Sequence, residues 1–212
     1  MAQTLGLAAE GLPIALGIGL IGVILLACGL VALGIVVLIA AMAAGAFFRD
    51  PERRAVGSFN TILSGADGRV TEITEASIPE HAGQRFHRVS VFMSPLDVHV
   101  NRAPASGEIV ATVHTPGEFR AAFRDDAGER NERNLILING ADGRPYAMMQ
   151  IAGYLARRIV CRLRPHDRVE RGQRIGLIMF GSRVDHFMPF EYRVTVKPGE
   201  RVRAGESVIG EL

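Results

Sequence analysis

The chain has 212 residues, with 24 basic and 22 acidic side chains, so its charge balance points to no particular partner. Its two cysteines, Cys28 and Cys161, lie far apart, which gives neither a disulfide framework nor the ligand spacing of a metal site. Lys197 is the only lysine, so an enzyme or carrier that attaches its cofactor to a lysine has a single attachment point here.

The N-terminal part is strongly apolar. No charged residue occurs between Glu10 and Arg49, a stretch made mainly of Gly, Ala, Leu, Ile and Val. A run of this length without a basic flank is typical of a membrane segment rather than a signal peptide. It is too long for one span and barely long enough for two. We therefore expect either a helical hairpin that turns near Cys28 and Gly29, or one tilted helix preceded by an interfacial piece that starts near Pro13.

Residues 1–48 are accordingly predicted to be a membrane anchor of one or two helices, and residues 49–212 one compact domain. Three arginines, Arg49, Arg53 and Arg54, follow the apolar run directly. Basic residues next to a membrane segment tend to remain in the cytoplasm, so the domain is expected on the cytoplasmic side of the inner membrane.

Beyond Pro51 the helical period disappears. Short segments rich in β-branched or apolar residues alternate with Gly, Pro, Asp and Asn, which predicts a mainly β domain of many short strands. The segments expected as strands are Arg88–Phe92, Gly107–Val113, Leu135–Asn139, Tyr146–Ile151, Arg174–Phe180 and Glu191–Val196.

The C-terminal part contains an internal repeat. Pro165-His-Asp-Arg-Val-Glu-Arg-Gly172 matches Pro198-Gly-Glu-Arg-Val-Arg-Ala-Gly205 in its proline, acid, Arg-Val pair and glycine. Each copy predicts a turn, a short strand, a glycine turn and a second strand. Pairs of such units are typical of barrel-sandwich folds related to lipoyl and biotinyl domains, and this is the fold we expect. A second echo joins Gly65-Ala-Asp-Gly-Arg69 to Gly140-Ala-Asp-Gly-Arg144, in which Asp-Gly indicates a tight turn.

The dipeptide Gly181-Ser182 ends a predicted buried strand and precedes an expected polar turn. A serine hydroxyl held in a strained turn can attack the preceding carbonyl carbon when a base activates it and donors stabilise the oxyanion. A glycine before the serine removes the side chain that would block this approach. Taken alone, the residues from Phe180 to Asp185 fit an ordinary turn better.

A second candidate site contains Asp97 and His99, which alternate with apolar neighbours. On a strand the two side chains would share one face. A histidine beside a carboxylate can act as a general acid or base near neutral pH, although a lone histidine on a strand is more often structural.

Seven arginines occur in the 18 residues that include Arg157, Arg158, Arg162, Arg164, Arg168, Arg171 and Arg174. Part of this cluster fits a solvated face with partners such as Asp167 and Glu170, and the rest suits a surface facing anionic lipid. Nucleic acid is not an expected partner, because no aromatic side chains are interleaved to stack on bases.

Five motifs occur in the order found in the short bacterial and archaeal phosphatidylserine decarboxylases, which the chain resembles from about Phe47 to Val184. They are Phe47-Phe-Arg-Asp-Pro-Glu-Arg53, Ala66-Asp67-Gly68, Ser94-Pro-Leu-Asp-Val-His99, Asn131-Glu-Arg-Asn134 and Phe180-Gly-Ser-Arg-Val-Asp185. Each motif is weak by itself, and five in order are specific. The apolar N-terminal segment also fits this family.

The resemblance implies that the chain cuts itself between Gly181 and Ser182. The serine would attack the Gly181 carbonyl to give an ester, and elimination would release a β chain (1–181) and an α chain (182–212). Ser182 would become a pyruvoyl group, the cofactor, with loss of ammonia. That group would form a Schiff base with phosphatidylserine and accept the electrons freed as carbon dioxide leaves, giving phosphatidylethanolamine. The implied partners are phosphatidylserine, membrane lipids, and the α and β chains in a heterodimer that can oligomerise further.

The resemblance also implies that an aspartate and a histidine assist the serine. By motif position the aspartate is Asp67, because Asp142 lies in a near-copy whose context fits less well. The larger bacterial branch carries the pattern Asp-x-His-x-x-His. This chain has His99 at the first histidine of the pattern and Arg102 in place of the second. An arginine cannot serve as a base at neutral pH. Either His99 serves both maturation and decarboxylation, or His186 takes one role, and we favour His99.

Three other functions remain open. A lipoyl- or biotinyl-like carrier, or an adaptor domain of a membrane complex, would share the repeat and the anchor. However, Lys197 ends a predicted strand before Pro198 rather than lying at a hairpin tip, and adaptor heptads are absent from the sequence. A pyruvoyl enzyme for a soluble amino acid would need no anchor. The serine phospholipid could also carry an archaeal-type lipid core.

Overall fold

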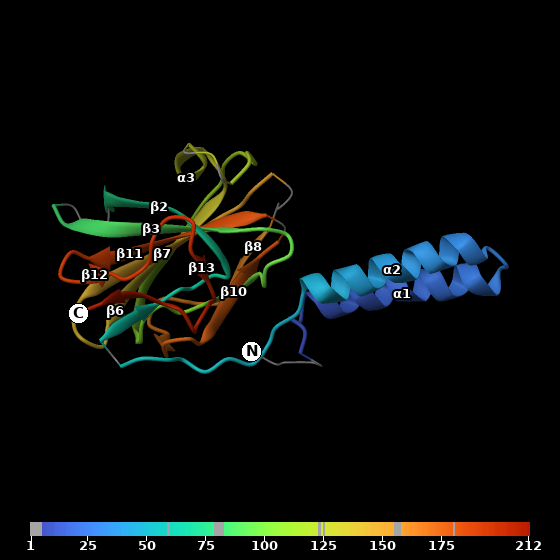
Figure 1. The fold of residues 1–212 in the computed structure, drawn as a ribbon, viewed down its shortest axis with the longest axis horizontal. Coiled ribbons are helices and arrows are strands. Elements are labelled where there is room, and N and C mark those ends of the chain that lie inside the picture. Colours follow the sequence, from blue (N-terminus) through green and yellow to red (C-terminus); the bar gives the residue numbers. More distant parts are fainter. Residues whose placement is uncertain are drawn as a thin grey trace. The chain divides into compact units, whose positions relative to one another are not determined.

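The computed structural model describes residues 6–58, 60–78, 83–122, 124, 126–154, 158–179 and 181–212. The chain divides into two compact units between Glu52 and Arg53, just beyond the boundary expected from the sequence. The first unit contains a pair of long helices and the second is a β domain (Figure 1).

Helices α1 (Gly11–Ala27) and α2 (Val31–Phe47) form an antiparallel hairpin. Gly29, in the connection, has a φ of 79°, a left-handed conformation that glycine adopts without a steric penalty. Of the two arrangements that the sequence allowed, the hairpin is therefore the one observed. Gly22 lets the helices approach closely, because a Cβ there would lie 2.8 Å from Cδ2 of Leu38.

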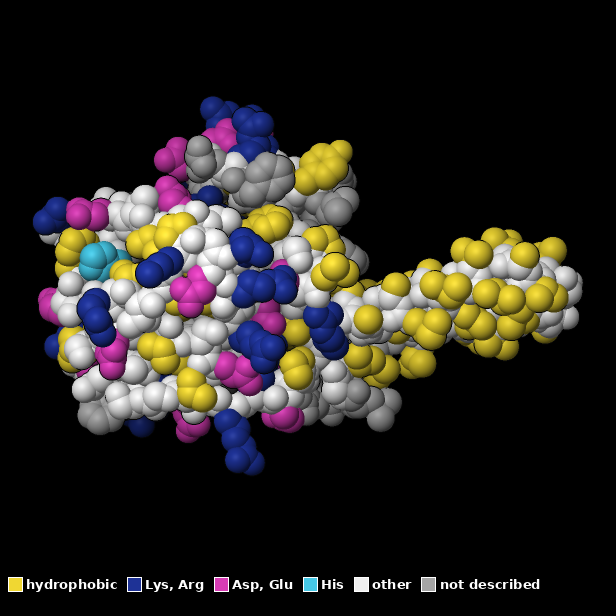
Figure 2. Space-filling view, in the orientation of Figure 1, with side chains coloured by type: hydrophobic (Ala, Val, Ile, Leu, Met, Phe, Trp, Pro, Cys, Tyr) yellow, Lys and Arg dark blue, Asp and Glu magenta, His cyan; other side chains and the backbone are white. Residues whose placement is uncertain are grey.

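The surface of the hairpin is apolar along its length (Figure 2). Several large apolar residues are more than half exposed, including Leu16, Leu20, Leu33, Val36 and Met42. Nevertheless, within the part of the chain that the structure describes, neither these helices nor any other is long and apolar enough to cross a membrane. The predicted transmembrane span is therefore not supported.

The second unit is built of short antiparallel strands, which confirms the prediction of a mainly β domain. Eight strands form one curled sheet in the order β13-β2-β3-β11-β7-β6-β5-β9, and two sheets of three strands have the orders β1-β14-β12 and β4-β10-β8. The elements are β1 (Thr61–Leu63), β2 (Gly68–Ser77), β3 (Arg85–Met93), β4 (Val100–Arg102), β5 (Gly107–Thr115), α3 (Ala127–Arg130), β6 (Arg133–Gly140), β7 (Pro145–Ile151), β8 (Ile159–Cys161), β9 (Arg168–Val169), β10 (Arg174–Ile178), β11 (Ser182–Pro189), β12 (Arg193–Val194), β13 (Arg201–Val202) and β14 (Val208–Glu211).

Five of the six predicted strands correspond to β3, β5, β6, β7 and β10, although Phe180, the expected end of the last, lies outside the described residues. The sixth, Glu191–Val196, contains only the two-residue strand β12. Of the longer strands, β2 and β11 were not predicted. Strand β2 has few apolar side chains, and β11 carries charged residues at buried positions.

The internal repeat forms a pair of equivalent units. Each copy contains a turn, a two-residue strand (β9 or β13) and a glycine with left-handed φ, 81° at Gly172 and 74° at Gly205. The N–H of Gly172 donates to Ala103 O at 2.8 Å and that of Gly205 donates to Ser64 O at 2.7 Å. The two glycines also pack together, because a Cβ on Gly205 would lie 3.4 Å from Cα of Gly172.

Candidate active site

Ser182 begins strand β11 inside the domain, where it is completely buried. It lies opposite Met93 at the end of β3, and its hydroxyl donates to the Met93 sulfur at 3.4 Å. All eight residues of β11 are buried, so the polar turn expected after Gly181 is wrong. Gly181 has a φ of 59°, and no described atom lies within 4 Å of a Cβ placed on it. A glycine is therefore favoured here by backbone conformation and not by lack of space.

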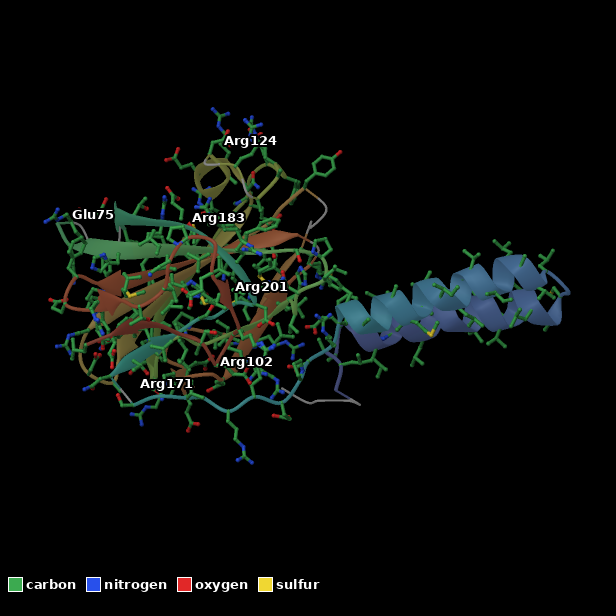
Figure 3. The ribbon with its side chains drawn as sticks, viewed as in Figure 1. Glu75, Arg102, Arg124, Arg171, Arg183 and Arg201 are labelled. Atoms are coloured by element: carbon green, nitrogen blue, oxygen red, sulfur yellow. The ribbon has the colours of Figure 1, made fainter. Side chains whose placement is uncertain are left out.

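A buried ion pair explains why a strand with charged residues follows Ser182. Arg183 donates to the carboxylate of Asp185 through Nε at 2.6 Å and Nη2 at 2.7 Å, and the two side chains are 4% and 2% exposed. Arg183 Nη1 lies 3.4 Å from the carbonyl oxygen of Arg124, beneath the segment that carries α3 (Figure 3). Because the two charges neutralise each other, the face of β11 opposite Ser182 can be buried.

Asp67 lies at the same end of the sheet as Ser182. Strand β2 begins at the next residue and pairs with β3, which pairs with β11, so two strand spacings of about 5 Å separate Asp67 from Ser182. The Asp67 carboxylate accepts two hydrogen bonds from the guanidinium of Arg53, of which that from Nη2 measures 2.8 Å. It also accepts the N–H of Ala204 at 2.8 Å. These contacts fix the carboxylate near the end of β11 where Ser182 lies.

Asp142, the aspartate of the near-copy motif, lies at the opposite end of β7. The strand separates it from Ser182 by about 20 Å at 3.3 Å per residue. Burial would raise the pKa of Asp142, but hydrogen bonds from Tyr146, Arg144 and Tyr192 hold it below its usual value. The Tyr192 hydroxyl donates to this carboxylate at 3.0 Å.

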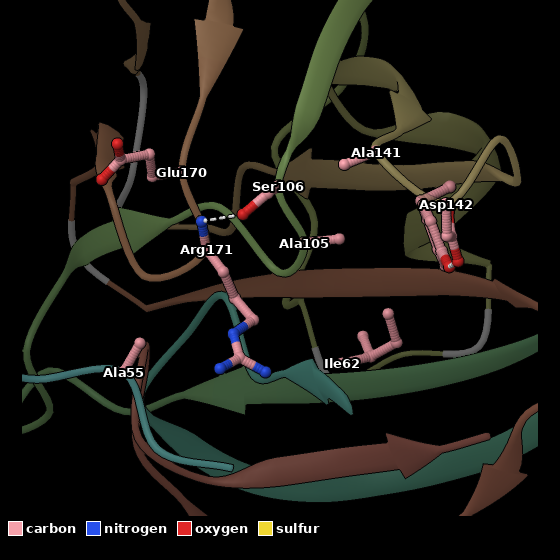
Figure 4. Close-up of a pocket in the computed structure, with 9 residues that line it drawn as sticks. Ala55, Ile62, Ala105, Ser106, Ala141, Asp142, Glu170 and Arg171 are labelled. Carbon is pink, nitrogen blue, oxygen red and sulfur yellow. Dashed lines mark hydrogen bonds between the residues drawn. The ribbon is translucent and has the colours of Figure 1, made fainter. Parts of the chain in front are cut away.

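A cavity of about 500 Å³ opens beside Asp142 (Figure 4). The residues that line it are Ala55, Ile62, Ala105, Ser106, Ala141, Asp142, Tyr146, Glu170 and Arg171. The guanidinium of Arg171 is occupied by the chain itself, since it donates to Gly57 O at 2.8 Å and to Thr61 O at 3.2 Å. The cavity thus lies at the end of the domain remote from Ser182.

Asp97 and His99 are not on a strand, which corrects the expectation that they share one strand face. Pro95 has no N–H to donate to a neighbouring strand, and Ser94 donates to the Asp97 carboxylate from its N–H at 2.8 Å and its hydroxyl at 2.7 Å. These bonds close a turn, and β4 begins only at Val100. Arg201 also donates to this carboxylate, at 3.1 Å.

His99 is 2% exposed and lies beside the chain that leads to Gly181. Its carbonyl oxygen accepts the N–H of Ile178 at 3.3 Å, three residues before Gly181. Its ring Nδ1 is 2.9 Å from the carbonyl oxygen of Asp97. Because a carbonyl only accepts, Nδ1 carries the proton, and in the neutral ring Nε2 holds the lone pair that a base needs.

His186 points to the same side of β11 as Ser182, but both its ring nitrogens are engaged. Nδ1 donates to Val89 O at 3.1 Å, and Nε2 accepts the N–H of Gly65 at 2.7 Å. Burial lowers the pKa of His186 to about 4, outweighing the opposite effects of Val89 and Asp185. The ring is therefore neutral near pH 7, and a backbone N–H occupies its basic lone pair.

Arg102, which stands at the second histidine position of the larger branch, is buried and bonds to the repeat. Its Nη1 donates to the carbonyl oxygen of Gly172 at 3.0 Å. Of the arginine cluster, Arg158, Arg162, Arg164 and Arg168 are exposed, and Arg157 lies outside the described residues.

A chain of buried amides reaches the Ser182 contact and was missed by the sequence reasoning. Asn134 donates to Gln150 at 3.1 Å, and Gln150 donates to Asn101 at 2.9 Å. Asn101 in turn lies 3.7 Å from the Met93 sulfur that the Ser182 hydroxyl contacts. The signal in the sequence was Gln150, a polar residue within an apolar predicted strand.

Comparisons with known proteins identify the family of the chain. A sequence model of the family described as phosphatidylserine decarboxylase matches residues 42–210. The chain is 48% identical to the phosphatidylserine decarboxylase proenzyme of Syntrophus aciditrophicus over 164 residues, covering 77% of each chain. It is 47% identical to the proenzyme of the same name from Saccharopolyspora erythraea over 169 residues, which cover 78% of this chain and 72% of that protein. The match covers most of the chain and both sides of the Gly181–Ser182 bond, and the chain belongs to the phosphatidylserine decarboxylase family.

Proposed function

We propose that this chain cuts itself between Gly181 and Ser182 and then decarboxylates phosphatidylserine to phosphatidylethanolamine. The observation that carries the proposal is the position of Ser182, buried at the start of β11 directly after a glycine with left-handed φ. The relatives support it, because their names describe a proenzyme, a precursor that must be processed.

The self-cleavage needs only atoms of the chain and one water molecule. The Ser182 hydroxyl loses its proton to a base and attacks the Gly181 carbonyl carbon. The peptide C–N bond breaks as the ester forms, and the base returns the proton to the Ser182 nitrogen, which becomes a free amine. Loss of the Ser182 α-proton then breaks the ester C–O bond, which leaves a carboxylate on Gly181 and a dehydroalanine at position 182. Water adds to the imine form of that residue, ammonia leaves, and a pyruvoyl group remains at the start of the α chain.

The surroundings of position 182 fit a pyruvoyl group. The group is covalent and needs no separate binding cleft, and Ser182 lies in a water-poor interior beside the thioether of Met93. When present, the group supplies an electrophilic ketone and an electron sink for decarboxylation. Position 182 starts a fully buried strand, so the rest of β11 would hold the group after the cut.

We assign the two polar helpers to different tasks. Asp67, held by Arg53 at the Ser182 end of the sheet, is proposed to assist self-cleavage by orienting or charging the group that deprotonates the hydroxyl. His99, next to Ile178, is proposed to take up a proton at Nε2 and to pass it to the product carbon after carbon dioxide departs. His186 is the weaker candidate for either task, because a backbone N–H occupies its lone pair.

We propose that the enzyme acts at a membrane surface. The helical hairpin exposes apolar side chains on residues such as Leu20 and Val36, which suits burial of this surface at a membrane without requiring either helix to cross it. Arg49 and Arg54 follow the apolar run, which favours a cytoplasmic position for the β domain at the inner membrane. Such an anchor would keep the active site next to its lipid substrate.

After the cut the two chains would remain together as a heterodimer, because β11 of the α chain lies between β3 and β7 of the β chain. The paired repeat around Gly172 and Gly205 supports a relationship to barrel-sandwich domains of the lipoyl type.

The function is tested by incubating purified protein with vesicles that contain phosphatidylserine and, separately, with free serine. We expect phosphatidylethanolamine from the wild type, none from Ser182→Ala, and no product from free serine. Turnover of free serine alone would favour the soluble amino acid enzyme instead.

A further inference from the structure

We infer that Gly153 and Asn131 are positioning residues for self-cleavage, which hold the carbonyl group of the Gly181–Ser182 bond in the orientation that the serine attacks. The inference rests on the proposed function. Neither residue carries a group that reacts, and each acts through the backbone around the bond to be cut.

The carbonyl oxygen of Gly181 lies directly against Gly153. A Cβ placed on Gly153 would be 1.8 Å from that oxygen and 3.0 Å from the Gly181 carbonyl carbon. Real Cβ atoms do not approach an oxygen so closely, so any side chain at position 153 must push the carbonyl away or move itself. The φ of Gly153 is not left-handed, so the close approach alone requires glycine here.

The backbone beside Gly153 is held from both sides. Ala152, the preceding residue, donates its N–H to Glu132 O at 2.9 Å. Its carbonyl oxygen accepts the side chain N–H of Asn131 at 2.7 Å. The peptide plane that leads into Gly153 is therefore fixed, and Gly153 keeps a fixed position against the carbonyl oxygen of Gly181.

Asn131 is completely buried, and its side chain amide bonds to two separate segments of the backbone. Besides Ala152, its Nδ2 donates to Arg120 O at 2.8 Å, and its Oδ1 accepts the Arg120 N–H at 3.1 Å. It thus joins the segment before α3 to the end of β7. That segment also contributes Ala122, whose Cβ would lie 3.2 Å from a Cβ at Gly153.

This arrangement matters for the acyl shift because the hydroxyl must reach the carbonyl carbon along one direction. The oxygen's contact with Gly153 sets the plane of the carbonyl group and therefore the face offered to Ser182. A displacement of about 1 Å at a reacting centre can lower a rate about 100-fold. Gly153→Ala is expected to slow cutting by at least that factor.

The first test follows cutting on denaturing gels after synthesis of the full chain, for the wild type, Gly153→Ala and a matched control, Gly107→Ala. A Cβ on Gly107 would also meet a backbone oxygen, at 2.2 Å from Asn139 O, but at the opposite end of the sheet. We expect the control to cut at close to the wild-type rate and Gly153→Ala to remain mostly uncut.

Hydroxylamine identifies the step that fails. It cleaves an ester between Gly181 and Ser182 but leaves a peptide bond intact. We expect no release of the α chain from Gly153→Ala, because the ester does not form. An ester that accumulates and is cleaved by hydroxylamine would place Gly153 after the acyl shift and overturn the inference.

A second variant protects the test against misfolding. Asn131→Asp keeps the size of the side chain and removes the two donated hydrogen bonds, and Asn139→Asp, at an exposed position, is its control. Thermal melts in the Ser182→Ala background report folding independently of cutting. If Gly153→Ala does not fold, the cutting of Asn131→Asp relative to Asn139→Asp tests the inference instead. Folded variants that cut as fast as the wild type would refute the inference, whereas an uncut wild type would refute the proposed function itself.

Discussion

The hydroxyl of Ser182 donates to the sulfur of Met93, which lies opposite it across β11 and β3, at 3.4 Å. A thioether is a weak acceptor, so this hydrogen bond restrains the hydroxyl less than a bond to a carbonyl or carboxylate would. The serine is thus buried but free to turn towards the Gly181 carbonyl at small cost. The site combines a rigid backbone around the bond to be cut with a loosely held nucleophile.

Removing the carboxylate of Asp67 is expected to leave the chain uncut. Asp67→Ala also leaves the buried guanidinium of Arg53 without its carboxylate, which costs about 3–5 kcal/mol when a buried ion pair loses one partner. The double variant Asp67→Ala with Arg53→Ala separates the two effects, because it removes the buried charge as well. We expect it to fold better and still remain uncut on a denaturing gel. Restored cutting in the double variant would assign Asp67 a purely structural role.

Removing the imidazole of His99 is expected to affect turnover more than maturation. His99→Ala should give at least some cut chain, with phosphatidylethanolamine formation lowered by about 10²–10⁴-fold, the usual cost of losing a positioned acid or base. The measurement is lipid product per mole of cut chain. Because Arg102 stands where the larger branch has a second histidine, an entirely uncut variant would show that His99 serves both steps. Full turnover by cut protein would remove His99 from the reaction.

The neutral state of His186 predicts a stability that depends on pH. Its pKa is about 4 in the folded chain against 6.5 when exposed, so the unfolded state takes up the proton first as the pH falls. The stabilisation is complete above about pH 6.5 and decreases towards pH 4, by up to about 3 kcal/mol, since each pKa unit corresponds to about 1.4 kcal/mol.

Thermal or urea unfolding of uncut Ser182→Ala between pH 4 and pH 7 measures this effect. His186→Gln in the same background can still bond to Gly65 N–H and Val89 O but does not titrate. We expect a flatter profile for the glutamine variant. Parallel profiles for the two proteins would show that His186 is not the group responsible.

Deletion of residues 1–48 is expected to release the β domain from membranes. All the residues assigned to cutting lie beyond the hairpin, in the second compact unit, so the shortened chain should still cut itself. Flotation with phospholipid vesicles compares the full and shortened chains. A full chain that stays in the soluble fraction without detergent would contradict the proposed anchor.

The sequence predicted the elements whose signals are local. Short runs of β-branched or apolar residues between Gly, Pro, Asp and Asn marked β5, β6 and β7. A glycine marked the turn of the hairpin, and the repeat marked the pair of units around Gly172 and Gly205. These features depend on neighbours along the chain. The family motifs likewise contain Asp67 and Ser182, which the fold brings to one end of the sheet.

The features that escaped prediction depend on contacts between distant residues. Strand β11 was not recognised because its sequence contains the charged residues Arg183 and Asp185. The two side chains lie on the same side of the strand and form an ion pair, which allows both to be buried. The sequence predicted His99 on a strand, but a hydrogen bond from the N–H of Ser94 to the Asp97 carboxylate closes a turn before it. The role inferred for Gly153 needs the position of Gly181 O, which lies in a different segment of the chain.

The central claim is that Ser182 becomes the pyruvoyl group, and intact mass under denaturing conditions tests it most directly. The wild type should give two chains, one ending at Gly181 and one spanning residues 182–212 that is lighter by one ammonia than the peptide beginning with serine. Ser182→Ala should give a single chain of full mass. A wild-type protein that remains a single chain, or an α chain that keeps its serine, while phosphatidylserine is still decarboxylated would contradict the account.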